Sequence, residues 1–246
     1  GYDPSKIAAL MSEKTTDPIE PIASSLEEII AQRQKELTRY QSYAYAQRYI
    51  KYVEKIRATE EKAVPGQTAL TEAVARALFK LMAIKDEYEV ARLYTDGRFK
   101  KQLEQQFENH KRLEFHLAPP LLGKVDRHGH PVKVSYGPNM FFLFKILSSL
   151  RFLRATPFDI FGFTKERRME RRLISDYCNL VDGLLPLLDA AHHSLAVEIA
   201  SLPMQLRGYG HVKMRHLDEM IQKRDALLAS YRAIKRDHSG LIQAAE

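Results

Sequence analysis

Apolar residues recur at three- and four-residue steps along most of the chain, which is the period of an amphipathic α-helix. The first such stretch covers residues 25–63 and opens with Ser25 and Glu28 at the spacing of a capping box, so we expect one long helix there. A break at residues 64–66 separates it from a second helical pattern, which extends to Leu93. Further helices are expected over the following ranges: 97–108, 139–153, 164–185, 194–202 and 211–236, with Thr164 as the cap of the third of these.

The period changes between residues 111 and 136. Leu113, Phe115 and Leu117 alternate with polar residues, and Val132 and Val134 do the same further on. A period of two is typical of a strand, so we expect a small antiparallel β-ribbon insertion near 111–136, with residues 126–130 at its tip. The predicted fold is therefore mostly α, with about six or seven helices and one ribbon.

The two ends of the chain differ from this pattern. Residues 1–24 contain Pro4, Pro18 and Pro21 among polar residues and have no apolar period, which indicates an extended linker from something that precedes it. We expect residues 25–236 to form a single helical domain and residues 237–246 to be a tail.

Composition excludes several classes of protein. An apolar fraction of 45% in 246 residues excludes a disordered chain. The single cysteine, Cys178, cannot supply a disulfide framework, a four-thiolate zinc site or an iron-sulfur cluster, and it favours a cytoplasmic location. The longest apolar run, 139–153, is interrupted by Lys145 and Arg151 and is shorter than the ~20 residues that span a bilayer, so no membrane helix is expected.

The excess of positive charge is local. The chain has a net charge of +7, and residues 124–174 hold 11 basic and 4 acidic residues, which accounts for all of it. Seven of the eleven phenylalanines lie in the same segment. Because no nucleic-acid-binding motif accompanies this charge, we do not expect nucleic acid as a partner. The combination instead indicates a contact surface that is apolar on one side and cationic on the other.

Four arginines just inside a predicted helix are the main candidate site. Arg167 and Arg171 would lie one helical turn apart, as would Arg168 and Arg172, so that two ridges present guanidinium groups. Together with Lys213 they are candidates for binding an anion or a partner. Three interpretations stay open: ion pairs with neighbours that include Glu166 and Glu170, a docking surface for an acidic protein, and a site for a phosphate of a small molecule.

Two further residues are candidates for a structural role. Lys85 continues the apolar stripe of the second predicted helix, and Glu89 follows four residues later, so the pair could satisfy a half-buried lysine. The nine histidines never show the i, i+4 spacing of a zinc-binding helix. The spacing along the chain also supports no Ser-His-Asp, paired-carboxylate or Cys-His catalytic arrangement. We therefore expect no metal site and no catalytic residue.

Four blocks of the sequence occur together in a known family. They are residues 70–96 (LTEAVARALFKLMAIKDEYEVARLYTD), 115–122 (FHLAPPLL), 156–162 (TPFDIFG) with the arginine run after it, and 207–213 (RGYGHVK). Through these blocks the chain resembles, over about residues 25–236, the C-terminal region of the long, fused bacterial indolepyruvate:ferredoxin oxidoreductases. These enzymes are a branch of the 2-oxoacid:ferredoxin oxidoreductases.

The resemblance implies a parent enzyme with chemistry of its own. That enzyme would oxidatively decarboxylate an aryl-pyruvate with thiamine diphosphate, pass electrons through 4Fe-4S clusters to ferredoxin, and transfer the acyl group to coenzyme A. The family's diphosphate-binding Gly-Asp-Gly and its cluster cysteines are absent from this chain, so no catalytic residue is carried over and no cofactor is expected in it. Residues 1–24 would then be the linker from a preceding catalytic domain.

The expected function is therefore that of a non-catalytic C-terminal module in a cytoplasmic enzyme. It would pack on the catalytic domains of the same polypeptide or at the interface of a homodimer. The alternative is a docking module, in which the basic face of residues 165–172 binds acidic ferredoxin or the phosphates of coenzyme A.

Overall fold

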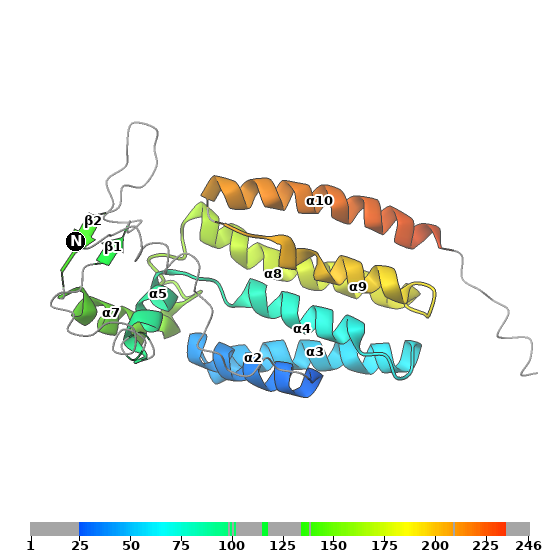
Figure 1. Ribbon diagram of the computed structural model, residues 1–246, viewed down its shortest axis with the longest axis horizontal. Helices are drawn as coiled ribbons and strands as arrows, with labels where there is room; N and C mark the ends of the chain where they lie inside the picture. The colour runs from blue at the N-terminus through cyan, green and yellow to red at the C-terminus, as the bar shows by residue number, and fades with distance from the viewer. Residues whose placement is uncertain are drawn as a thin grey trace, which may run out of the picture. The chain divides into compact units, whose positions relative to one another are not determined.

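The computed structural model describes residues 25–97, 99, 101, 115–117, 134–137, 139–208 and 210–234. In this part of the chain the protein is mostly helical, as expected, with eight α-helices (Figure 1). The residues group into two compact units. The small unit comprises Gly1–Glu28 and Asp86–Leu150, and the bundle unit comprises Ile29–Lys85 and Arg151–Glu246. The range predicted as a single domain, 25–236, divides between these two units.

The stretch predicted as one long helix is two helices, α2 (Leu26–Tyr40) and α3 (Tyr43–Ala63). The predicted capping box is confirmed, since the Ser25 hydroxyl accepts from the Glu28 N–H and the Glu28 carboxylate accepts from the Ser25 N–H, both at 3.2 Å. The break falls at Ser42, whose backbone is extended and whose hydroxyl accepts from the Tyr45 N–H at 3.1 Å. A serine that caps a new helix ends the old one, and this does not disturb the apolar period.

The second predicted helix is divided in the same way, into α4 (Ala69–Met82) and α5 (Glu87–Thr95). The Asp86 side chain caps α5 by accepting from the Glu89 N–H at 2.8 Å. Lys85 is consequently exposed in the connection before α5, and Glu89 pairs with Arg92 at 2.6 Å. The prediction that Lys85 continues a buried stripe with Glu89 as its partner is wrong, because Asp86 starts a new helix.

Helix α4 forms the centre of the bundle unit. Nine of its fourteen residues are buried, and it packs against α3, α8 (Lys165–Leu184) and α9 (His193–Ser201). Figure 1 shows α4 running between α3 on one side and α8 and α9 on the other. Helix α10 (Gly210–Ala233) covers α9. A helix that is apolar on nearly all sides has to lie inside a bundle, which is why α4 occupies this place.

Tyrosine hydroxyls connect the helices of the bundle unit. Tyr49 donates to the Ala75 carbonyl at 3.1 Å and Tyr177 donates to the Ala200 carbonyl at 2.9 Å. Burial raises the pKa of both hydroxyls well above the ordinary value. Each ring therefore fills core volume while its polar end is satisfied by a helix carbonyl. Both tyrosines therefore have a packing role.

The small unit has a core of its own around α5 and α7 (Met140–Ser149). Ala91 and Phe144 are buried there, and Tyr94 stacks on Phe144 with ring centroids 5.1 Å apart. A 3₁₀ turn (Leu150–Leu153) follows α7. In the described part of the chain, no helix combines the length and the apolar character needed to cross a membrane.

Two short strands also belong to the small unit. β1 (Phe115–Leu117) pairs antiparallel with β2 (Val134–Tyr136), and His116 lies opposite Ser135. Both strands fall inside the segment for which a ribbon was predicted. The helix expected over 97–108 and the ribbon as a whole, with its tip at 126–130, lie largely outside the described residues, so the ribbon insertion stays a prediction.

Candidate partner-binding surface

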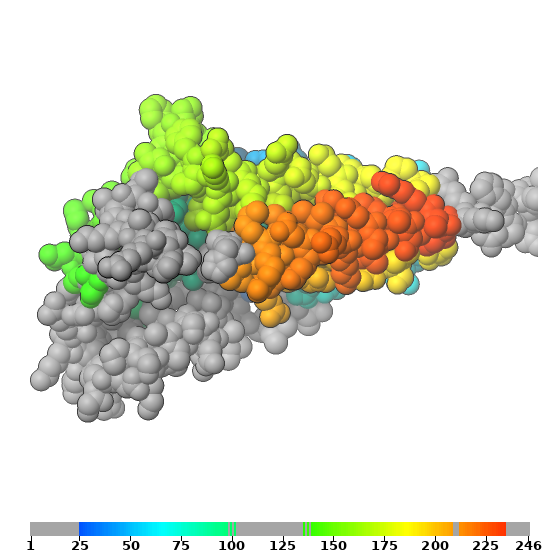
Figure 2. Space-filling model, turned by 90° about the horizontal axis from the view of Figure 1, so that it is seen from above, coloured from blue at the N-terminus to red at the C-terminus, as the bar shows by residue number. Residues whose placement is uncertain are grey.

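The connection between α7 and α8 ends in a loop that exposes large apolar side chains. We call residues 155–164 the Phe loop. Phe158 is 74% exposed, Ile160 58% and Phe163 63%. Figure 2 shows this segment, in light green, standing out from the neighbouring helices of the bundle unit. Three large apolar side chains within six residues form an exposed patch of the kind that marks interaction sites.

A buried carboxylate fixes the shape of the Phe loop. Asp159 is only 5% exposed, and its two oxygens accept from the N–H groups of Ala155 and Gly162, each at 3.0 Å. Ala155 takes a positive φ of 60°, a conformation that costs free energy for a residue with a Cβ atom. At Gly162 a Cβ atom would lie 2.3 Å from an Asp159 carboxylate oxygen, so a larger residue would displace the carboxylate. The loop is thus built around Asp159.

Two arginines attach the loop to the bundle unit. Arg154 is buried, donates to the carbonyl of Tyr40 at the end of α2, and stacks on the Tyr40 ring with its guanidinium 3.8 Å from the centroid. Arg171 on α8 donates to the Gly162 carbonyl at 2.5 Å and lies 4.0 Å from the Asp159 carboxylate. Charge-assisted hydrogen bonds of this kind are about twice as strong as neutral ones. The loop is therefore held at both ends.

This construction has an energetic consequence. Leaving a Phe or Ile side chain in water forgoes about 1.5–3 kcal/mol relative to burying it. A flexible loop could fold such side chains back onto the protein, but the contacts of Asp159, Arg154 and Arg171 hold the backbone in place. The loop therefore presents Phe158, Ile160 and Phe163 in a preorganised form, which lowers the entropic cost of binding a partner.

An open pocket of about 370 Å³ lies against the loop. Its lining includes Thr156, Pro157, Phe163 and the side chains of Asp159 and Arg171. Both charged groups of this pocket are already engaged with the loop backbone or with each other. The pocket is therefore a hollow next to the exposed side chains, suited to receiving a side chain of a partner.

The candidate basic residues are divided among different roles. Arg167 pairs with the buried Glu170 at 2.6 Å, and Lys213 from α10 pairs with the other oxygen of the same carboxylate. Arg171 belongs to the Phe loop, as described above. Arg168 and Arg172 are exposed and have no ion-pair partner in the described residues. The ion pair with Glu170, one of the three interpretations, is present for Arg167. Of the two predicted ridges, Arg168 and Arg172 stay exposed on one face, whereas Arg167 and Arg171 are engaged with Glu170 and the Phe loop.

The exposed part of this cationic group follows one face of α8. Lys165, Arg168 and Arg172 occupy positions i, i+3 and i+7, which share a face of a helix, and all three are exposed. We call these three residues the α8 stripe. It begins directly after the Phe loop, because Thr164 caps α8 as predicted by accepting from the Arg167 N–H at 3.2 Å. Exposed apolar side chains of the Phe loop are therefore followed directly by the exposed cationic side chains of the α8 stripe, and their use as a contact surface stays a prediction.

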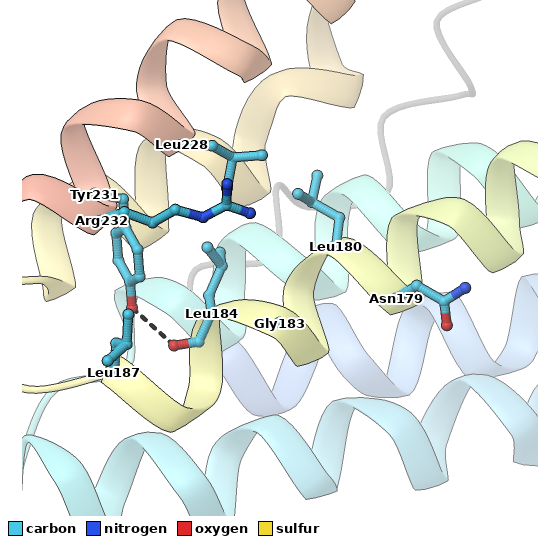
Figure 3. Close-up of a pocket in the computed structure, with 8 residues that line it drawn as sticks. All are labelled: Asn179, Leu180, Gly183, Leu184, Leu187, Leu228, Tyr231 and Arg232. Atoms are coloured by element: carbon cyan, nitrogen blue, oxygen red, sulfur yellow. Dashed lines mark hydrogen bonds between the residues drawn. The ribbon is translucent and has the colours of Figure 1, made fainter.

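A second, smaller pocket lies between α8 and α10 (Figure 3). Its volume is about 140 Å³, and its apolar lining includes Leu180, Leu184 and Leu228. The hydroxyl of Tyr231 donates to the Leu184 carbonyl at 2.8 Å, so the phenol is engaged in helix packing. Nothing in this arrangement provides a nucleophile next to a base.

The other side chains that could bind a metal or act as a nucleophile show no arrangement for such chemistry in the described residues. The described residues contain no cluster of three or more metal-ligating side chains, and His128 and His130 lie outside them. Burial and the negative charge of Asp182 raise the pKa of the Cys178 thiol, which makes it less nucleophilic. The Tyr52 hydroxyl bonds to Asp182 at 2.9 Å.

Sequence reasoning missed the residues that shape this surface. Asp159 and Gly162 belong to a block that was noted for its family resemblance only, and Arg154 was not singled out. The available indication was an aspartate three residues before a glycine in a short segment after a predicted helix, a pattern typical of side-chain-stabilised turns. The pairing of Lys213 with Glu170 joins residues 43 positions apart, so no local pattern predicts it.

One comparison with known proteins gives a match. The model of a family of unknown function, DUF6537, matches residues 26–226. That range is most of the chain and includes the Phe loop and the α8 stripe, so the chain belongs to this family. Comparison with curated proteins gives no match, and comparison with solved structures gives none either.

Proposed function

We propose that this member of the DUF6537 family is a non-catalytic module of a 2-oxoacid:ferredoxin oxidoreductase of the indolepyruvate type. In this proposal the Phe loop packs on the catalytic domains of the same polypeptide or on the partner subunit of a homodimer. Thiamine diphosphate and 4Fe-4S clusters belong to the catalytic domains of the parent enzyme, and this chain supplies contacts.

The observation that carries the proposal is the preorganised exposure of the Phe loop. A buried carboxylate, a glycine whose replacement would displace that carboxylate, and two arginine anchors hold three large apolar side chains in solvent. Apolar anchors that enter a pocket of the partner supply most of the binding energy at protein interfaces. A loop built in this way is useful to a protein that binds another protein surface.

The parent enzyme is inferred from the sequence blocks. Residues 70–96, 156–162 and 207–213 resemble the C-terminal region of the fused oxidoreductases, and in this protein they form α4 and α5, the Phe loop, and the start of α10. The block 156–162 forms most of the Phe loop. The block 207–213 contains Lys213, which pairs with Glu170 on α8, the helix that carries the α8 stripe. This supports a role in which the surface faces the remainder of such an enzyme.

The proposal is tested by changing the Phe loop in the full-length parent enzyme. We expect Phe158→Ser together with Phe163→Ser to weaken assembly of the enzyme and to lower oxidation of the 2-oxoacid, because two anchors of about 1.5–3 kcal/mol each are lost. Size-exclusion chromatography with light scattering measures assembly, and ferredoxin reduction measures activity. The melting temperature of the isolated 246-residue chain should not fall, because both rings are exposed.

Phe142→Ser provides a matched control. Phe142 lies on α7 in the small unit and is 72% exposed, nearly the same fraction as Phe158, so the substitution removes a similar apolar area. The control should leave assembly and activity close to those of the wild type. An enzyme that assembles and turns over normally without Phe158 and Phe163 would contradict the proposal.

A second candidate function is docking of an acidic partner on the α8 stripe. The observation in its favour is that Lys165, Arg168 and Arg172 share one exposed face without an ion-pair partner in the described part of the chain. Acidic ferredoxin is the partner that the resemblance implies. The alternative ligand is coenzyme A, whose phosphates would bind the same positive charges. Charges of this kind mainly raise the association rate and make it depend on salt.

The two candidates give different results in the same kinetic experiment. If ferredoxin docks on the stripe, Arg168→Gln with Arg172→Gln raises the apparent KM for ferredoxin several-fold at low salt, and the difference disappears as ionic strength rises. An increase in the KM for coenzyme A instead would identify the phosphate interpretation. If the stripe serves neither, both KM values stay unchanged while the Phe loop variants still fail to assemble.

A further inference from the structure

The smaller pocket, between α8 and α10, lies in a seam to which both helices contribute residues one turn apart (Figure 3). We call it the seam pocket. Leu180 and Leu184 are four positions apart on α8, so they share a helix face. Leu228 and Arg232 have the same spacing on α10. All four residues line the pocket of about 140 Å³, so the fold brings two helix faces from distant parts of the sequence to one site.

The buried part of the seam pocket is apolar. Leu184 and Tyr231 are each only 1% exposed, and the Tyr231 hydroxyl is bound to the Leu184 carbonyl, so the phenol contributes mainly its ring. The remaining apolar lining is half-buried and consists of Leu180, Leu187 and Leu228. An apolar ligand body placed among these side chains would be removed from water, which favours binding.

A glycine in the lining leaves the seam pocket unfilled. Gly183 lines the pocket from α8, and nothing lies within 4 Å of the position that a Cβ atom would take there. Because Gly183 is inside a helix, where alanine would be more favourable, this glycine lowers the stability of α8. In return the position keeps free a space that a larger side chain could occupy.

Arg232 gives the seam pocket its charge. Among the described residues that line the pocket, Arg232 is the only charged one, and Asn179 adds a neutral amide. Figure 3 shows the Arg232 side chain extending from α10 over the gap between the two helices. It is exposed and has no hydrogen bond or ion pair in the part of the chain that the structure describes. The five N–H donors of this guanidinium suit a carboxylate, which can accept two parallel hydrogen bonds.

We propose that the seam pocket binds a small organic acid whose apolar body has about six carbon atoms, since a cavity of about 150 Å³ lined by Leu, Ile and Phe holds benzene. The body lies among the leucines, and the carboxylate accepts from Arg232 at the exposed rim, where Asn179 offers a further donor. One positive charge matches one carboxylate, and the apolar lining disfavours ligands with more charges. The site is independent of the proposed packing function, because it uses neither the Phe loop nor the α8 stripe.

The test is an NMR titration of the 246-residue chain with cyclohexanecarboxylate. We expect saturable binding with a Kd on the order of 1 mM, as for a ligand of this size, and shifts of the Gly183 and Arg232 amide signals. Two further probes separate the parts of the ligand. Cyclohexanecarboxamide has the same body without the charge, and acetate has the charge without the body. Each should bind at least about fivefold more weakly, because it loses either the charge-assisted hydrogen bonds or the apolar contacts.

Two substitutions locate the site. Arg232→Gln should weaken binding of the carboxylate about fivefold and leave binding of the carboxamide unchanged. Gly183→Leu should weaken binding of both, because the leucine side chain would take up the free space. Arg215→Gln is the matched control, since Arg215 is an exposed arginine of the same helix outside the pocket lining. It removes the same charge at a distance and should change the Kd less than about twofold.

Three results would overturn the proposal. The first is the absence of saturable binding up to about 20 mM. The second is a carboxamide or an acetate that binds as tightly as cyclohexanecarboxylate. The third is an Arg232→Gln variant that binds like Arg215→Gln. Circular dichroism checks that each variant is folded, and the exposed position of Arg232 keeps the test decisive even if Gly183→Leu does not fold.

Discussion

Two buried carboxylates in the bundle unit are used in opposite ways. Glu60 on α3 is fully buried and accepts from the N–H groups of Leu70 and Thr71, both at 2.8 Å, and from the ring of His193 at 2.7 Å. Asp159 is also buried and accepts from two backbone N–H groups. The two carboxylates make similar bonds, yet one lies among core helices and the other at the base of an exposed loop.

The difference lies in where the partners come from. The partners of Glu60 are 10, 11 and 133 residues away and belong to α4 and α9, so this carboxylate ties three helices together. The backbone partners of Asp159 are three and four residues away. A network of distant partners stabilises the fold, whereas a local network shapes one segment. Breaking the Glu60 network should therefore lower the stability of the fold, whereas breaking the Asp159 network should mainly weaken binding through the Phe loop.

The largest effect is expected from Glu60→Ala. The substitution leaves two buried N–H groups, the Thr71 hydroxyl and His193 without their acceptor, and loss of one partner from such a network costs about 3–5 kcal/mol. We expect the urea midpoint of the chain to fall accordingly, measured by far-ultraviolet circular dichroism. Unfolding would begin in the bundle unit, because Glu60 holds the start of α4.

Glu61→Ala is the matched control for this prediction. Glu61 is the next residue, is exposed, and accepts from the Gly66 N–H at 3.2 Å. The change should stay within about 0.5 kcal/mol, as surface substitutions usually do. A Glu60→Ala variant no less stable than Glu61→Ala would mean that the carboxylate network does not hold the helices together.

The contrast between local and distant partners also explains what the sequence could predict about the fold. The capping box at Ser25 and the cap at Thr164 were correctly predicted, because each involves residues three positions apart. The caps at Ser42 and Asp86 were missed although they are equally local, because the apolar period continues through both and suggested unbroken helices. Periodicity indicates which face is buried and gives no information on where a helix ends.

For the candidate surface, charge and aromatic content were predictable and the arrangement was not. The sequence showed that arginines and phenylalanines gather between residues 124 and 174. It could not show that Phe144 enters the core of the small unit while Phe158 stays exposed, because both lie in similar apolar surroundings along the chain. The distant partners of Arg154 and Lys213, namely Tyr40 and Glu170, are likewise set by tertiary structure.

An intermediate effect, confined to the loop, is expected from Gly162→Ala. The new methyl group would lie 2.3 Å from an Asp159 oxygen, so the carboxylate has to leave its two N–H donors. We expect the folded loop to lose about 1–3 kcal/mol of stability, which is the usual penalty for leaving buried polar groups unsatisfied. The loss should be measurable as faster hydrogen exchange at the Ala155 amide and as weaker assembly of the proposed parent enzyme. Loop exchange unchanged from wild type would show that Asp159 is not what orders the loop.

Gly183→Ala is the control for this prediction, with the same chemical change at a position on α8. Nothing lies within 4 Å of the position of its Cβ atom, and Gly183 is inside α8. Alanine is the better helix former, so this substitution should stabilise the chain by about 0.5–1 kcal/mol. Opposite signs for two Gly→Ala changes would confirm that the contact with Asp159, and not the added methyl group, is responsible.

The smallest effect concerns a third carboxylate, Asp189, which is partly exposed and precedes α9, the helix that carries the Glu60 partner His193. The Asp189 carboxylate is 2.6 Å from a ring nitrogen of the buried His192, and this hydrogen bond is the main reason why the pKa of Asp189 is lowered. A lowered pKa means that the folded state prefers the charged form. Its contribution to stability is therefore fully present above about pH 4 and is lost as the pH falls through the folded-state value.

Asp189→Asn should remove this pH dependence. The side chain of Asp189 is 38% exposed, so solvent screening limits the contribution to well under 1 kcal/mol. Urea midpoints measured between pH 6 and pH 3 should fall less steeply for the variant than for the wild type, with the two curves meeting at the acidic end. If the variant instead loses stability by the same amount at every pH, the carboxylate acts through its shape and hydrogen-bond geometry, and its charge is irrelevant. Glu60→Ala should exceed this effect at least three-fold at neutral pH, because its carboxylate is buried and its partners belong to other helices.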